Sequence, residues 1–186
     1  MYPETRESNK FQIIAMSSRI GDFESSKVAT AEFKKEYPKS NKTDSLDIMS
    51  MSTLYQDGDF ERAYQLASEV MQSDPKEPDL RQTAMFIEGD AAFRLKKYKE
   101  ANSVLQKYIN EYPEAQNIDT AMYSAASSLK NLKSYERAIR MFDRLTRKFP
   151  KKGDSPYLEF ALFDRAQSAL SLKSDEGNDK AMLDYD

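Results

Sequence analysis

The chain has no cysteine, no histidine and no tryptophan among its 186 residues. These absences remove thiolate nucleophiles, imidazole bases and the usual zinc ligands together. The sequence also has only five glycines and contains no glycine-rich phosphate-binding loop. We therefore expect a protein that is not an enzyme and that holds neither a cofactor nor a metal ion.

Long apolar segments are missing as well. No run of about 18 apolar residues is present, so no segment is expected to span a bilayer. The first residues lack both the basic start and the apolar stretch of a secretory signal, so any such signal lies outside this sequence. The formal net charge of −3 is too close to neutral to favour nucleic acid as a partner. With 39% hydrophobic and 32% charged residues, the composition favours amphipathic helices and predicts an all-α fold.

Five prolines recur at nearly constant spacing. They lie 35, 37, 38 and 37 residues apart, at Pro3, Pro38, Pro75, Pro113 and Pro150. Fifteen positions before each of the last four stands an aromatic residue, and twelve positions before stands a small one. The aromatic residues are Phe23, Phe60, Tyr98 and Tyr135, and the small ones are Ser26, Ala63, Ala101 and Ala138. Such coincidence indicates internal repeats, roughly four and a half of them, stacked on one another.

Each repeat divides into two helices. The second helix begins at the aromatic residue, carries apolar residues on one helical face and stops before the proline, which lacks an N–H and clashes with the preceding turn. Asp22, Asp59 and Ser134 are predicted to cap these helices, whereas Lys97 is not a capping residue. The first helix lies between one proline and the next aromatic residue. Gly89 and Ala126 occupy equivalent places in it, where a small side chain lets two helices cross closely.

Both ends of the sequence are predicted to interrupt the pattern. Tyr2 and Pro3 read as the close of a preceding unit. Ser155 and Pro156 are expected to start a fifth first helix over 157–172, followed by a loop over 174–178. Ala181 and Tyr185 then indicate the start of a tenth helix. We therefore expect a fragment of a longer array.

This combination of paired helices, an alanine and a large residue four positions later in the second helix, and a terminal proline resembles the tetratricopeptide repeat family. Ala138, Phe142 and Pro150 match the family pattern best. The resemblance implies a right-handed superhelical array of antiparallel helix pairs, an α-solenoid, over residues 1–186. The repeats are expected at about 5–38, 43–75, 79–113, 117–150 and, incompletely, 156–186.

The helix endings look like those of bacterial envelope members of the family, which include outer-membrane assembly lipoproteins and the Tol-Pal coordinator. Glu36-Tyr37-Pro38 and Glu111-Tyr112-Pro113 are two such endings. The resemblance implies a periplasmic or outer-membrane-associated protein, with a cytoplasmic location as the alternative. The lipoprotein cysteine is absent.

The family's fold implies a concave groove lined by the first helices, in which a peptide or a helix of a partner protein binds. Alignment of the repeats selects residues for this groove, with aromatic side chains for apolar contact and polar ones for direction. They are Ile48, Ser52, Tyr55, Phe86, Asp90, Phe93, Arg94, Tyr123, Ser127, Lys130 and Asn131. The alternative for each aromatic residue is packing between repeats.

A second candidate surface is a basic stripe on the opposite, convex side. It consists of Arg137, Arg140, Arg144, Arg147, Lys148, Lys151 and Lys152. Residues 130–152 hold nine basic and two acidic side chains, whereas residues 41–80 hold three and nine. Such a stripe attracts an anionic partner, which is an acidic protein, a nucleic acid or a membrane. The alternative interpretation is an ordinary solvent-exposed helix face without a partner.

We therefore expect an interaction scaffold or adaptor in a bacterial multiprotein complex, with a protein or peptide partner and no small-molecule substrate. Docking of an anionic partner on the basic stripe is the alternative function. Exposed apolar faces at the open ends of an array favour self-association.

Overall fold

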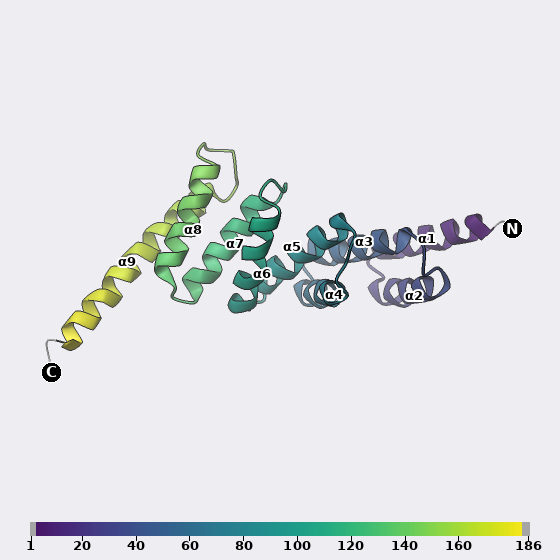
Figure 1. The fold of residues 1–186 in the computed structure, drawn as a ribbon, viewed down its shortest axis with the longest axis horizontal. Helices are drawn as coiled ribbons and strands as arrows, with labels where there is room; N and C mark the ends of the chain where they lie inside the picture. The colour runs from purple at the N-terminus through teal and green to yellow at the C-terminus, as the bar shows by residue number, and fades with distance from the viewer. Residues whose placement is uncertain (1–2, 184–186) are drawn as a thin grey trace. The chain divides into compact units, whose positions relative to one another are not determined.

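The computed structural model describes the backbone of residues 3–183 and the side chains of residues 5–173. All regular structure in this range is helical, which confirms the predicted all-α fold. The chain forms two compact units, residues 1–91 and residues 92–186. The helices are α1 (Pro3–Arg19), α2 (Phe23–Glu36), α3 (Lys42–Gln56), α4 (Phe60–Gln72), α5 (Pro78–Arg94), α6 (Tyr98–Glu111), α7 (Ile118–Asn131), α8 (Tyr135–Lys148) and α9 (Leu158–Leu183) (Figure 1).

Neighbouring helices pack as antiparallel pairs within each unit. In the first unit α1 packs against α2 and α3, and α3 packs against α4. In the second unit each helix from α6 to α9 packs against the next one (Figure 1), and α7 also reaches α9. First helices of successive repeats therefore meet directly, so residues on α7 and α9 share one surface.

Small residues allow this close packing. The residue twelve positions before each proline is buried in all four second helices, and the Ala63, Ala101 and Ala138 side chains are fully buried. Gly89 and Ala126, the predicted crossing residues of the first helices, are buried too. Large apolar side chains fill the space around them, led by Phe33 in the first unit and by Tyr108 and Phe142 in the second.

The turn inside each helix pair imposes a special backbone conformation. The residue two positions before the aromatic residue has a positive φ in all four turns: Gly21 (81°), Gly58 (79°), Lys96 (61°) and Lys133 (58°). Glycine adopts this left-handed conformation freely, whereas a lysine has a Cβ that crowds the following carbonyl group. The first two turns therefore carry the favoured residue, and the last two accept strain.

The prolines and most of the caps act as predicted. Each second helix ends two or three residues before its proline. The Asp22 carboxylate accepts a hydrogen bond from the Ser25 amide, and that of Asp59 accepts one from the Arg62 amide. Lys97 makes no side-chain capping bond, as expected. The prediction for Ser134 was wrong, because its hydroxyl makes no such bond although the residue occupies the cap position.

The predictions at the two ends need correction. Pro3 is the first residue of α1, which agrees with the tolerance of a helix for proline in its first turn. The loop over 174–178 and a separate tenth helix containing Ala181 are wrong, because α9 runs unbroken from Leu158 to Leu183. This segment contains no proline, and one glycine costs a helix only about 1 kcal/mol. Tyr185 lies outside the described residues.

The start of α9 is close to the predicted one. The Ser155 hydroxyl accepts a hydrogen bond from the Tyr157 amide and donates one to the Asp119 carboxylate, 2.8 Å away. The helix itself begins at Leu158, so Pro156 lies in the turn before it.

The positive φ angles lead to a prediction about stability. We expect Gly58→Ala to lower the free energy of unfolding by about 1–2 kcal/mol through the backbone conformation alone, since a Cβ at Gly58 meets no atom within 4 Å. Lys133→Gly should raise the free energy of unfolding by about 0.5–1 kcal/mol. The relief of backbone strain exceeds the free-energy cost of the extra conformational entropy that glycine gives to the unfolded chain. Lys133→Ala, which keeps the strain, is the control for loss of the side chain. Urea unfolding followed by circular dichroism measures all three, and a gain for Lys133→Ala equal to that for Lys133→Gly would contradict the explanation.

Candidate protein-binding surface

In the first unit, several predicted groove residues contact one another. The Tyr55 hydroxyl on α3 donates a hydrogen bond to the Asp90 carboxylate on α5, with an O–O distance of 2.6 Å. Asp90 is fully buried, at 0% exposure, and Phe86 is only 8% exposed. The Tyr55 and Phe86 rings meet edge to face, with centroids 5.8 Å apart. Phe86 and Asp90 thus pack between two first helices, while Tyr55 keeps part of its surface exposed.

The remaining predicted residues of this unit, Ile48 and Ser52, lie on α3 and are half-buried. The Thr53 hydroxyl beside them donates to the Met49 carbonyl of the same helix, 2.9 Å away. The α3 face is therefore partly open along the turns that contain Ile48, Ser52 and Tyr55.

In the second unit, the predicted residues divide by exposure. Arg94 and Asn131 are exposed, Phe93, Tyr123 and Lys130 are half-buried, and Ser127 is buried. The Phe93 ring lies 6.2 Å from that of Tyr98. The Asn131 amide group donates to the Ser127 carbonyl, 2.8 Å away, so it is fixed along its own helix.

A buried carboxylate joins α7 to α9. Asp164, on α9, accepts a hydrogen bond from the Tyr123 hydroxyl at 3.0 Å and an ion-paired bond from the Lys130 ammonium at 2.5 Å. The Lys130 ammonium also lies 3.3 Å from the Gln167 amide oxygen. Burial raises the pKa of the Tyr123 hydroxyl, and the Asp164 charge adds to the rise. Tyr123 therefore stays protonated as a donor and is held in one orientation.

The same position is polar in three successive repeats, and it makes a polar contact with the preceding first helix in two of them. Asp90, Ser127 and Asp164 are spaced by 37 residues, and the two carboxylates receive donors from Tyr55 and Lys130, which are equivalent positions on the preceding first helix. The equivalent position for Ser127 is Phe93, which has no donor. The Ser127 hydroxyl accordingly has no hydrogen-bond partner in the part of the chain that the structure describes.

An aromatic cluster lies next to this network in the second unit. The Tyr123 and Tyr157 rings stack with centroids 4.9 Å apart, and the Phe160 ring lies 6.4 Å from Tyr123. Phe160 is 61% exposed although it is a large apolar residue. Phe160 and Asp164 are not among the residues predicted from the sequence. One further step of 37 residues from Tyr123 and Ser127 is the signal that points to them.

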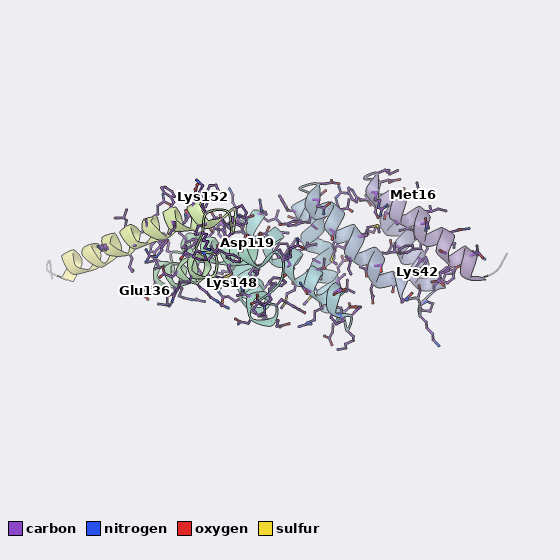
Figure 2. The ribbon with its side chains drawn as sticks, turned by 90° about the horizontal axis from the view of Figure 1, so that it is seen from above. Met16, Lys42, Asp119, Glu136, Lys148 and Lys152 are labelled. Carbon is purple, nitrogen blue, oxygen red and sulfur yellow. The ribbon has the colours of Figure 1, made fainter. Side chains whose placement is uncertain are left out.

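The basic stripe is exposed along α8 and the loop after it. Part of it is paired within the protein: the Lys148 ammonium contacts Glu114 at 2.9 Å, and that of Lys152 contacts Glu159 at 3.0 Å. The Arg147 guanidinium donates to the Asp143 carbonyl of its own helix. Lys148 and Lys152 both lie in the second unit and are labelled in Figure 2. Lys151 is exposed beside them.

The other three arginines of the stripe line one shallow cleft. Arg137, Arg140 and Arg144 surround a space of about 250 Å³ together with Gln106 of α6 and apolar side chains of α7 and α8. None of the three makes an ion pair or side-chain hydrogen bond with another described residue. Their positive charge is therefore concentrated and uncompensated at this cleft.

Two further features bear on the kind of site. In the described range, no three acidic, histidine or cysteine side chains gather closely enough to hold a metal ion. No described helix has both the length and the hydrophobicity to cross a membrane.

Comparisons with solved structures show the same fold. The chain is similar to MamA (residues 41 to the end) from Desulfovibrio magneticus RS-1, with 17% identity and a TM-score of 0.63, covering 94% of this chain and 96% of that one. It is similar also to a putative kinesin light chain with TPR-like repeats from Podosopora anserina, with 10% identity and a TM-score of 0.62, covering 99% and 94%. A search of the curated proteins finds no match.

Two family models match the sequence directly. Both describe the tetratricopeptide repeat, one over residues 54–129 and the other over residues 120–152. Together they cover more than half of the chain, which therefore belongs to the tetratricopeptide repeat family, whose members generally serve as protein-interaction scaffolds.

Proposed function

We propose that this protein is a scaffold that binds a peptide or a helix of a partner protein on the surface of its first helices. The main support for this proposal is the exposure of Phe160. This large apolar side chain is 61% exposed beside the cluster formed by Tyr123, Tyr157 and Asp164. Tyrosine and phenylalanine side chains bury much apolar area at little cost in side-chain entropy, so they are frequent anchors in protein interfaces.

The polar residues around Phe160 are suited to fix the direction of a bound segment. Asp164, Tyr123 and Lys130 are already held by one another, so little conformational freedom is lost when a ligand docks. Asn131 is exposed next to them and keeps its amide oxygen for a donor on the ligand. In the first unit, Ile48, Ser52 and Tyr55 provide the equivalent partly exposed face.

The buried members of the predicted groove have a different role in this proposal. Phe86, Asp90 and Ser127 support the surface from beneath, because their side chains are covered by neighbouring helices. Arg94 is exposed in the second unit and remains a contact residue in the proposal, together with Phe93.

The proposal includes a place in a bacterial multiprotein complex, at the cell envelope. Its support is the resemblance of the aromatic–proline helix endings to those of bacterial envelope members of the family. Several repeats in one chain suit simultaneous contact with several partners.

The first test concerns Phe160. The chain is immobilised, proteins captured from a native lysate are identified, and the affinity of each purified partner is measured by calorimetry. We expect Phe160→Ala to weaken a partner by about tenfold or more, as truncation of a central aromatic anchor does. Leu162→Ala is the matched control, because Leu162 is 51% exposed on the same helix but points away from Phe160 by about half a turn. Equal effects of the two variants would rule out the first-helix surface.

A second function has its own supporting observation. The three unpaired arginines at the α6–α8 cleft, Arg137, Arg140 and Arg144, favour docking of an anionic partner by long-range attraction. Arginine is well suited to this task because its planar guanidinium pairs with carboxylates and phosphates through two parallel hydrogen bonds. An acidic protein surface is the partner that we propose for this cleft.

The matching test uses charge reversal. We expect Arg140→Glu with Arg144→Glu to abolish capture of such a partner, and a rise in salt from 50 to 200 mM to weaken binding of the unmodified protein steeply. Lys151→Glu with Lys152→Glu changes the net charge equally at exposed positions outside the cleft, and this variant should retain most of the affinity. Binding that depends on neither salt nor the two arginines would exclude this function.

A further inference from the structure

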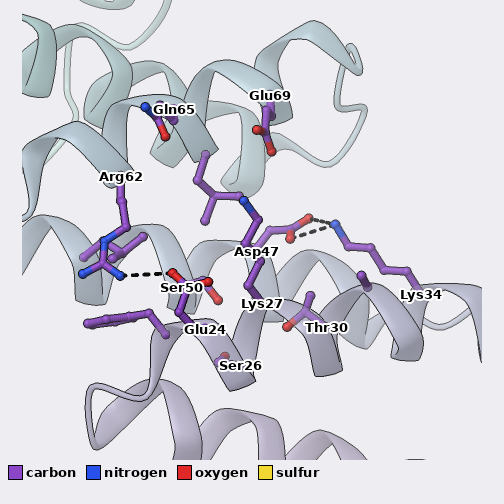
Figure 3. A pocket seen from close by; sticks show the side chains of 14 residues that line it. Glu24, Ser26, Lys27, Thr30, Lys34, Asp47, Ser50, Arg62, Gln65 and Glu69 are labelled. Carbon is purple, nitrogen blue, oxygen red and sulfur yellow. Dashed lines mark hydrogen bonds and ion pairs between the residues drawn. The ribbon is translucent and has the colours of Figure 1, made fainter.

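A cleft of about 320 Å³ opens between α2, α3 and α4 of the first unit, away from the residues assigned to the two surfaces above (Figure 3). Its volume lies at the lower end of the range for small-ligand pockets. Apolar contacts are provided by Phe23, Ala31, Leu54 and Leu66, and the rest of the lining is polar or charged.

The cleft exists because α2 and α3 have polar residues at positions that are apolar in α6 and α7. Twelve, eight and four residues before its proline, α6 has Ala101, Leu105 and Ile109, all fully buried. At the same offsets α2 has Ser26, Thr30 and Lys34. Asp47 of α3 likewise replaces a buried methionine, which stands at the equivalent positions as Met85 and Met122. The seam that α6 and α7 close with apolar side chains is therefore left open and polar between α2 and α3.

Thr30 leaves a hydrogen-bonding group unsatisfied in this seam. The residue is 7% exposed and lines the cleft, yet its hydroxyl has no hydrogen-bond partner among the described residues. A buried hydroxyl without a partner destabilises the fold, and a valine of the same shape would avoid the cost. A group that enters the cleft and accepts a hydrogen bond would remove it.

Most of the charges in the cleft are already neutralised. The Lys34 ammonium contacts both carboxylate oxygens of Asp47, at 2.8 and 2.7 Å (Figure 3). Asp47 is only 6% exposed; burial raises the pKa of its carboxyl group, and the Lys34 ammonium opposes the rise. The Arg62 guanidinium is bound to Asp59 and lies 3.5 Å from Glu24.

Two charged side chains of the lining remain available. Lys27 lies one turn before Thr30 on the same helix, and its ammonium has no partner among the described residues. The Glu69 carboxylate, on α4, makes no hydrogen bond or ion pair with another described residue. The cleft thus has a cation and a hydroxyl on the α2 wall, and an acceptor on the α4 wall (Figure 3).

We propose that this cleft binds the carboxylate of an acidic side chain in a peptide segment of a protein partner. Lys27 and Thr30 donate to the carboxylate, Glu69 accepts a backbone N–H of the same segment, and apolar neighbours of the acidic residue pack on Leu54 and Leu66. An amino-acid residue within a peptide supplies carboxylate, N–H and apolar flanks together, which a free dicarboxylate does not. The proposal rests on the function of the protein as a scaffold but uses a different surface.

The test is a titration of the isotope-labelled full chain with a capped Leu-Glu-Leu tripeptide, followed by amide chemical shifts. We expect saturable shifts at Lys27 and Thr30, and an affinity about tenfold or more lower for the Leu-Gln-Leu analogue, since hydrogen bonds to a charged group are the stronger ones. Glutarate is titrated in parallel, to test whether a free dicarboxylate binds the cleft as well as a peptide does. Glutarate binding as tightly as the tripeptide, or equal binding of the two tripeptides, would overturn the proposal.

Variants separate binding from folding. Lys27→Gln should reduce the tripeptide affinity by about tenfold, whereas Lys35→Gln, which removes the same charge from an exposed position of the same helix outside the cleft, should leave it unchanged. Thr30→Val should weaken binding and raise the melting temperature, because it removes an unpartnered buried hydroxyl. Thr53→Val, in the same unit, removes a hydroxyl that is already bonded to Met49 and should not affect the tripeptide.

These outcomes are independent of the first-helix surface. Phe160 lies in the second unit, so the Phe160→Ala variant should bind the tripeptide with normal affinity. A loss of partner binding on the first-helix surface can therefore be distinguished from a loss of tripeptide binding in the cleft. Equal losses for Lys27→Gln and Lys35→Gln, or a Thr30→Val protein that melts higher and binds unchanged, would show that the cleft has no such ligand.

Discussion

The structure depends on the seam where the second helix of one repeat meets the first helix of the next. A single helix pair cannot cover its own apolar stripe, so each repeat is stable only because the following one closes this seam. In the second unit the closure is apolar: Leu105 and Ile109 of α6 and Met122 of α7 are all fully buried. The position of every surface residue on the first helices follows from this packing, because it fixes which side of α7 and α9 faces away from the second helices.

Most of the fold could be predicted because its determinants are local. Proline stops a helix by geometry, an aspartate before an aromatic residue caps the next one, and a small residue at each crossing marks the contact. These signals repeat every 35 to 38 residues, so each repeat supports the interpretation of the others. The prediction failed where a local signal was weak, as in the segment around Gly177, which lacks a proline and stays helical. It failed again at Ser134, whose type suits a cap but whose hydroxyl does not bond.

The binding surface was less predictable, for a physical reason. Alignment finds equivalent positions, but it does not say whether an equivalent position is covered by its neighbour. Phe86 and Asp90 are covered because Tyr55 reaches them, whereas Phe160, at the position equivalent to Phe86, is exposed. The exposure of a side chain depends on what occupies the facing position one repeat away, which is tertiary information. Asp164 shows the same dependence, since its role follows from Tyr123 and Lys130 on another helix.

Repeat proteins make departures from their own pattern informative, because the other repeats serve as an internal reference. At the seam between α2 and α3, the chain has a threonine, a lysine and an aspartate where the equivalent positions of α6 and α7 have Leu105, Ile109 and Met122. The Lys34 side chain is 45% exposed, and ion pairs with an exposed partner contribute only about 0–1 kcal/mol, so the ion pair of Lys34 and Asp47 gives this seam no advantage in stability over the apolar closure. Natural sequences break local rules of packing mainly at functional sites. The same chain closes the equivalent seam between α6 and α7 with apolar side chains. The polar seam between α2 and α3 is therefore better explained by recognition of a ligand than by a contribution to stability.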